Sequence, residues 1–95
     1  LQSVYDQTLG LINTGATIDH DCEIGDYAHI GPGCHLSGGV TVGEGALVGV
    51  GACIRPGARV GSWATIGAGA AVIADVPDYA IYAGVPAKSL PGRGR

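Results

Sequence analysis

The chain carries an aliphatic side chain at every sixth position through most of its length. The series runs over eleven successive hexads without a slip, and its members are Ile12, Ile18, Ile24, Ile30, Leu36, Val42, Val48, Ile54, Val60, Ile66 and Val72. A six-residue period fits neither the three- and four-residue steps of an amphipathic helix nor the two-residue alternation of a simple strand. It is typical of a repeat in which each hexad supplies one short strand and one turn.

Two further features of the hexad favour a narrow, regular core. A small residue, most often Ala or Cys, lies two positions before nearly every aliphatic one. Residues i and i−2 share a face of a strand, so both should point inward. Glycine recurs directly after the aliphatic residue and three positions after it, where we expect the backbone to turn, often with positive φ. The hexads therefore predict an all-β, parallel β-helix (hexapeptide repeat), with three hexads in each triangular coil and three to four coils in all.

Two acids mark the ends of the repeat. Asp6 and Asp78 occupy the next aliphatic phases outward from the series, and a charge at a core position is costly. The terminal coils of a repeat protein also need segments that shield the core. The sequence thus predicts a β-helix domain over residues 12–76, an N-terminal cap or linker over residues 1–11, and a C-terminal cap and tail over residues 77–95.

Composition excludes several classes of protein. The formal net charge of −3 and the pI of about 5.3 argue against a nucleic-acid partner, which calls for a basic face. No apolar run approaches the length of a membrane-spanning helix, and no charged-then-apolar leader opens the chain. Cys22, Cys34 and Cys53 show no metal-type spacing and are expected to be free thiols. We therefore expect a cytoplasmic protein without membrane insertion.

Two segments resemble a known family. These are INTGATIDHDCEIGDYAHI at residues 12–30 and GVPAK at residues 84–88. They resemble the bacterial hexapeptide-repeat sugar acetyltransferases, the family of sialic acid O-acetyltransferases and UDP-bacillosamine N-acetyltransferases. The resemblance covers residues 12–90 and is most specific at I-D-H-D-C, which a second His follows nine residues later. It implies left-handed winding, acetyl-CoA as cosubstrate and a homotrimer with its sites at subunit interfaces.

One departure from the family concerns the acceptor. The relatives usually carry an N-terminal α/β domain that holds the nucleotide or the sugar, and this chain shows none. We therefore expect either an excised catalytic domain or a unit that acts on a different acceptor.

His20 and Asp21 are the candidate catalytic residues. Acetyl transfer from a thioester needs a base for the attacking amine or hydroxyl and a donor for the oxyanion. His20 lies at a corner phase of its hexad, where a side chain projects outward, and imidazole titrates near neutrality. The carboxylate of Asp21 would fix the ring tautomer and stabilise the imidazolium. The alternative is that both are ordinary surface residues.

Four residues are candidates for binding acetyl-CoA because of the resemblance: His29, Val50, Ala68 and Lys88. His29 would contact the acetyl carbonyl region, whereas main-chain groups at Val50 and Ala68 would border the pantetheine arm. All five basic residues lie in the second half of the chain, and six of the eight acids precede residue 45. The phosphates of CoA should therefore lie near the basic end, at Arg59, Lys88 or the tail arginines, roughly 18 Å along the axis from the acetyl group.

The spacing of the histidines leads to a trimer and leaves alternatives open. His29 follows His20 by nine positions and is therefore expected on another face, so two subunits are needed to bring the two side chains together. His35 is interpreted as a surface or interface residue, and no metal is expected. The preferred function is acetyl transfer to the amine of a nucleotide-activated amino sugar. The alternatives are O-acetylation of a sialic acid-type sugar, a non-catalytic β-helix scaffold, and a carbonic-anhydrase-like zinc hydratase with three converging histidines.

Overall fold

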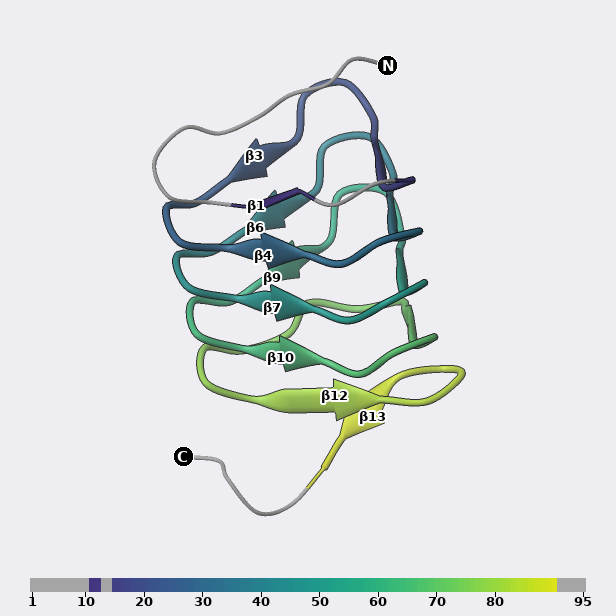
Figure 1. The fold of residues 1–95 in the computed structure, drawn as a ribbon. Coiled ribbons are helices and arrows are strands. Elements are labelled where there is room, and N and C mark those ends of the chain that lie inside the picture. Colours follow the sequence, from purple (N-terminus) through teal and green to yellow (C-terminus); the bar gives the residue numbers. More distant parts are fainter. Residues whose placement is uncertain (1–10, 13–14, 91–95) are drawn as a thin grey trace.

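The computed structural model describes residues 11–12 and 15–90, and their regular structure consists of short β-strands wound into a triangular prism (Figure 1). The first face holds β1 (Leu11–Ile12), β4 (His29–Ile30), β7 (Leu47–Val48), β10 (Thr65–Ile66), β12 (Ile81–Ala83) and β13 (Lys88–Ser89). The second holds β2 (Thr17–Ile18), β5 (His35–Leu36), β8 (Cys53–Ile54) and β11 (Ala71–Val72). The third holds β3 (Glu23–Ile24), β6 (Thr41–Val42) and β9 (Arg59–Val60).

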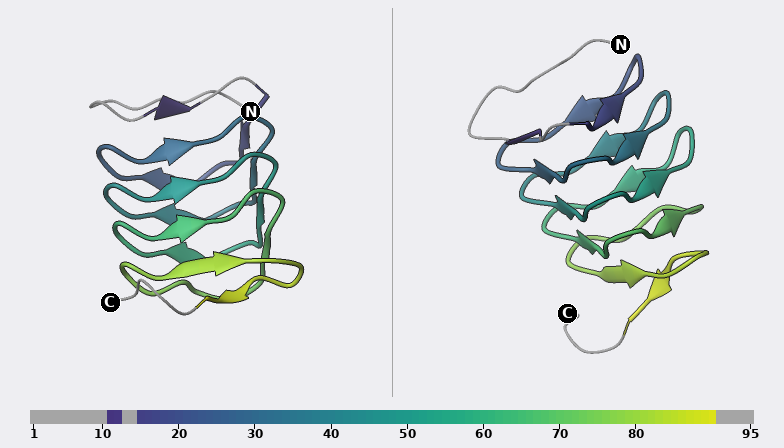
Figure 2. Two further views of the ribbon diagram at one scale, coloured as in Figure 1. Left: turned by 60° about the horizontal axis from the view of Figure 1, so that its bottom comes forward. Right: turned by 45° about the vertical axis from the view of Figure 1, so that its right-hand side comes forward.

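The chain follows the three faces in turn, and each passage between faces is a corner of four residues. The first corner, from the first face to the second, comprises residues 31–34, 49–52 and 67–70. The second corner comprises residues 19–22, 37–40 and 55–58, with one exception in the last coil, where it is shortened to residues 73–74 because Val76 pairs with Val60 of the third face. The third corner comprises residues 25–28, 43–46, 61–64 and 77–80. Each corner therefore lies opposite one face, and successive coils of the left-handed parallel β-helix stack with the same orientation (Figure 2).

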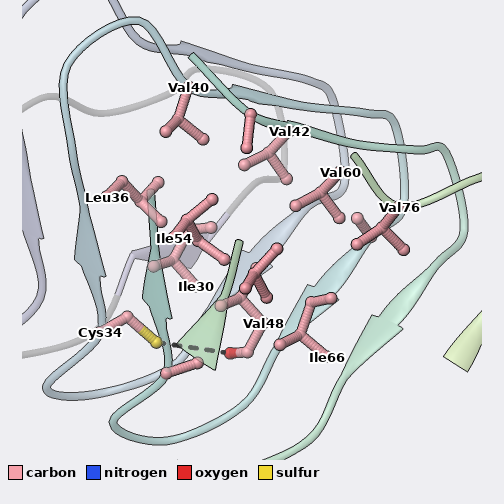
Figure 3. Close-up of a cluster of buried hydrophobic side chains, with 14 of the residues drawn as sticks. Ile30, Cys34, Leu36, Val40, Val42, Val48, Ile54, Val60, Ile66 and Val76 are labelled. Carbon is pink, nitrogen blue, oxygen red and sulfur yellow. Dashed lines mark hydrogen bonds between the residues drawn. The ribbon is translucent and has the colours of Figure 1, made fainter. Parts of the chain in front are cut away.

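The register between coils is the one that the hexads predict. His29 pairs with Leu47, and Leu47 pairs with Thr65, so that residues eighteen apart stack on one another. From Ile18 to Val72, the aliphatic residue of each hexad points inward together with the small residue two positions earlier (Figure 3). Burying one such aliphatic side chain contributes about 1.5–3 kcal/mol. Among the described residues, the fully buried core thus contains aliphatic and small side chains without an aromatic one, and Tyr82 packs against it in the last coil.

The two glycine phases have different roles. Glycines three positions after the aliphatic residue have positive φ, as at Gly33 with +72° and Gly51 with +70°. Glycines directly after the aliphatic residue are needed for close approach, because a Cβ on Gly43 would lie 2.6 Å from the backbone N of Ser62 in the next coil. The expectation of positive φ is therefore met for the glycines three positions after the aliphatic residue, whereas the glycines directly after it let neighbouring coils approach.

The last coil is shorter than the others. Thr65 pairs with Ile81, and Val60 forms a bridge with Val76, so both pairs are sixteen residues apart instead of eighteen. The two-residue shortening places β12 beneath β10 on the first face, and β13 then turns back antiparallel to β12. The predicted division at residue 76 lies within this shortened side.

Two remaining predictions concern the membrane and the N-terminus. The part of the chain that the structure describes contains no helix, and so none able to cross a membrane. The predicted cap or linker at residues 1–11 lies outside the described residues except for Leu11.

Candidate functional site

The structure brings His20 and Asp21 together at the second corner. Nδ1 of His20 lies 3.2 Å from Oδ2 of Asp21, and the two side chains are 83% and 84% exposed. Asp21 has φ of +64°, and this left-handed backbone conformation turns the side chains of His20 and Asp21 toward one another. A carboxylate only accepts hydrogen bonds, so the tautomer of the neutral ring that suits this contact has its proton on Nδ1 and leaves Nε2 as an acceptor. The pair therefore has the arrangement of a base with its orienting acid.

The ring of His20 lies beside Gly38 of the next coil, where a methyl group on Gly38 would make an ordinary van der Waals contact with it. A Cβ on Gly38 would lie 3.4 Å from Cε1 and 3.7 Å from Nε2 of His20, and the carbonyl of His20 accepts a hydrogen bond from the N–H of Gly39 at 3.2 Å. Gly38 belongs to neither glycine phase of the hexad and does not have positive φ. Sequence reasoning missed this residue, although a glycine outside both phases was the signal that pointed to it.

The four candidate acetyl-CoA residues lie along the first face and the first corner. His29 is half-buried on β4, and Lys88 is exposed on β13 at the far end of the same face. Val50 and Ala68 lie one above the other at the first corner, both exposed, and the carbonyl of Val50 accepts a hydrogen bond from the N–H of Gly69 at 2.8 Å. β12 lies three coils beyond β4, which is about 14 Å along the axis of the prism.

The backbone of the first corner is open to an approaching ligand. A Cβ on Gly51 or Gly69 would meet no atom within 4 Å. A long, thin ligand can therefore lie against this corner and contact the main chain directly. That property suits the extended pantetheine arm of CoA, and the charge of Lys88 suits its phosphates.

One chain does not bring the two groups of residues together. His20 lies at the second corner, opposite the first face that carries His29, so the hydrophobic core separates them. The spacing argument predicted this placement on different faces. Arg59, another candidate for the phosphates, lies on the third face, away from Val50 and Ala68.

His35 lies on the exposed second face, and its Nδ1 is hydrogen-bonded to Oγ1 of Thr17 in the preceding coil. His20, His29 and His35 thus occupy a corner and two different faces. Among residues 11–12 and 15–90, no group of three or more His, Cys, Asp or Glu side chains is placed to hold a metal ion. Within one chain, the geometry that a zinc hydratase needs is not assembled.

The three cysteines are free and differ in burial. Burial raises the pKa of the Cys34 thiol and of the Cys22 thiol above the ordinary value of 9.0. Cys34 is fully buried and donates to the carbonyl of Gly49 at 2.8 Å, so it acts as a small core residue. Cys53 is exposed on the second face, away from His20 and His29.

The chain is similar to several solved acetyltransferase structures. The acetyltransferase domain of PglB from Neisseria gonorrhoeae FA1090, in complex with acetyl coenzyme A, is 49% identical with a TM-score of 0.84, and the match covers 85% of this chain and 40% of that one. PerB from Caulobacter crescentus, in complex with CoA and GDP-perosamine, is 49% identical with a TM-score of 0.86, over 87% and 40%. WeeI from Acinetobacter baumannii AYE is 32% identical with a TM-score of 0.82, over 85% and 41%.

These matches show the family of the chain and the share of its relatives' length that the chain covers. The chain spans about two fifths of the length of these solved structures. Neither protein-family models nor curated protein sequences gave a match. The shared prism and the identity of 49% confirm the resemblance found in the sequence, and the chain belongs to the hexapeptide-repeat family of sugar acetyltransferases.

Proposed function

We propose that the chain is the β-helix part of an acetyl-CoA-dependent acetyltransferase that acts on the amine of a nucleotide-activated amino sugar. The exposed His20–Asp21 pair carries the proposal, because its imidazole is hydrogen-bonded to a carboxylate and open to solvent, where an acceptor can approach. PerB supports the acceptor class, since it is described as a GDP-perosamine N-acetyltransferase and was solved with GDP-perosamine.

The chemistry is a direct transfer. The amine nitrogen attacks the thioester carbonyl, the C–N bond forms, and the C–S bond breaks to release CoA. Nε2 of His20 takes the proton from the amine, Asp21 stabilises the resulting imidazolium through Nδ1, and the proton then passes to the thiolate of the departing CoA, which restores the base. No covalent bond to the protein is needed if both substrates bind together.

The site requires a second copy of the chain. Acetyl-CoA would lie along the first corner of one subunit, between His29 and Lys88. His20 of a neighbouring subunit in a homotrimer would then meet the thioester, because two prisms can place a face and a corner against one cleft. The cytoplasmic location predicted from the composition stays a prediction.

The test is acetyl transfer measured by mass spectrometry of the acceptor, which avoids interference from the exposed thiol of Cys53. Acceptors are GDP-perosamine, a UDP-4-amino-sugar and sialic acid. His20→Ala should lower kcat by about 10²–10⁴-fold and leave the Kd for acetyl-CoA unchanged. His35→Ala is the matched control, because His35 is an exposed histidine outside both groups of candidate residues.

The alternatives give different results in the same assay. Acetylation of sialic acid alone supports an O-acetyltransferase. Acetyl-CoA binding without transfer to any acceptor supports a non-catalytic scaffold. Unchanged kcat in His20→Ala would exclude His20 as the base, and stoichiometric zinc in the purified protein would favour the hydratase.

A further inference from the structure

The third corner carries aromatic side chains where the other corners have glycine. Tyr27, Trp63 and Tyr79 have φ of +62°, +59° and +63°. At the equivalent positions of the first and second corners, the residues with positive φ are glycines apart from Asp21. A side chain with a Cβ costs roughly 1–2 kcal/mol in this conformation. Backbone stability alone therefore does not account for three aromatic residues in one column.

These aromatic side chains form an exposed ladder. Tyr27 and Trp63 are each 49% exposed, and Tyr79 is 58% exposed. The Trp63 ring lies over Gly45 of the preceding coil, and a Cβ on Gly45 would clash with its six-membered ring. The ring thus rests on backbone on one side and remains open to solvent elsewhere.

Carboxylates lie beside the aromatic side chains on the same corner. Asp26, Glu44 and Asp78 each occupy the position before the residue with positive φ, and all three are exposed. Asp78 accepts a hydrogen bond from the backbone N–H of Ser62 at 2.8 Å. The four described ranges of this corner contain no Lys or Arg. Acidic and aromatic groups therefore follow the corner at the coil spacing of about 4.8 Å.

The ladder is separate from the residues assigned to acetyl transfer. The third corner lies opposite the second face, whereas Val50 and Ala68 lie at the first corner and His20 at the second. The inference is independent of the proposed function for the same reason.

We propose that the third corner is a docking surface for an extended segment of a partner protein that carries arginine. A guanidinium plane stacks on an aromatic face and pairs with a carboxylate at the same time, and each rung offers one or both groups. Lysine has a compact, strongly hydrated charge and gains less from the aromatic ladder. A neutral sugar would use the aromatic rings but would leave the three carboxylates uncompensated.

The first experiment uses Trp63 as its own reporter, because it is the only tryptophan in the chain. The protein is titrated with eight-residue peptides of alternating Gly-Arg, Gly-Lys and Gly-Glu. The Gly-Arg peptide should change the Trp63 emission, bind about three- to tenfold more tightly than Gly-Lys, and bind where Gly-Glu does not. The titration is repeated with Arg93→Ser/Arg95→Ser, because these two arginines of the chain are potential competitors.

The second experiment separates docking from packing. Trp63→Gly places the residue that best tolerates positive φ, so the Tm should not fall by more than a few degrees. Binding of a fluorescently labelled Gly-Arg peptide should weaken about tenfold. Asp26→Asn should also weaken binding, whereas Asp19→Asn makes the same charge change at the second corner and should not.

Three results would overturn the docking surface: equal affinity for Gly-Arg and Gly-Lys peptides, displacement of the peptide by a neutral oligosaccharide, and unchanged binding in Trp63→Gly. A large fall in Tm with unchanged peptide binding assigns the Trp63 ring to packing of the corner.

Discussion

At the scale of single residues, the orientation of His20 depends on its hydrogen bond to Asp21. Oδ2 of Asp21 lies 3.2 Å from Nδ1 of His20, whereas Gly38 of the next coil leaves space beside the edge that carries Cε1 and Nε2. The hexad requires neither Asp21's left-handed backbone nor a glycine at position 38. We infer that Asp21 orients the ring, because its carboxylate is hydrogen-bonded to Nδ1 of His20.

Gly38→Ala should leave kcat and stability close to those of the wild type. The added Cβ would lie 3.4 Å from Cε1 of His20, which is an ordinary van der Waals contact, and the exposed ring can keep its place beside it. The kcat, the Kd for acetyl-CoA and the Tm should therefore not change. Gly57→Ala is the control, because Gly57 at the same corner has φ of +75° and no atom within 4 Å of an added Cβ. That variant should lose stability and keep kcat; a large fall in kcat for Gly38→Ala would show that the ring of His20 needs the space beside Gly38 during the reaction.

The buried thiol of Cys34 makes the free energy of unfolding depend on pH in the alkaline range. Burial raises the pKa of Cys34 above 9.0 in the folded state, so the unfolded chain loses this proton first as the pH rises. The free energy of unfolding should therefore fall from about pH 9 upward, by at most about 1.4 kcal/mol per pH unit for one thiol. Urea unfolding at pH 7–10 measures the slope, and Cys34→Ala should reduce it.

A thiol reagent should label Cys53 first and Cys34 only on unfolding; rapid labelling of Cys34 in the folded protein would contradict its burial.

At the scale of elements, each strand contributes only two or three residues, so the coils depend on stacking between them. The two glycine phases of the hexad serve this stacking in different ways. One phase lets the backbone turn with positive φ, and the other lets neighbouring coils approach. Substitutions in the two phases should therefore have different costs.

Gly43→Ala should destabilise the prism more than Gly51→Ala. A Cβ on Gly43 meets backbone at 2.6 Å, so two coils must separate, whereas a Cβ on Gly51 meets nothing and adds only the strain of its φ of +70°. We expect a loss of about 3 kcal/mol or more for Gly43→Ala and about 1–2 kcal/mol for Gly51→Ala. Urea unfolding of both variants measures the difference, and a larger loss for Gly51→Ala would reverse the assignment of the two phases.

At the scale of the whole molecule, the prism keeps the acid–base pair and the acetyl-CoA residues apart. His20 lies at the second corner, and the first face with His29 lies on the opposite side of the core. The proposed reaction therefore depends on assembly. Two inactive variants can test this dependence, because each would supply the residue that the other lacks.

A mixture of His20→Ala and His29→Ala chains, refolded together in equal amounts, should regain activity. In random trimers, about one quarter of the interfaces combine an intact His20 with an intact His29. We therefore expect about a quarter of the wild-type kcat from the mixture, and at most about a hundredth of it from His20→Ala alone. Size-exclusion chromatography with light scattering provides the trimer mass. A mixture as inactive as its components would contradict a site shared between subunits.

The sequence by itself determined the prism and the side of the backbone on which each residue lies. Both follow from the six-residue period, which is a local property, and so the outward positions of His20 and His29 could be predicted. The tertiary structure decided what those outward side chains touch, because their neighbours are about eighteen residues away and depend on the stacking register. Three such contacts depend on the register: His20 lies beside Gly38, the ring of Trp63 lies over Gly45, and the shortened last coil brings β12 under β10. The pairing of His20 with Asp21 required one more condition, the left-handed backbone of Asp21, which the period does not specify.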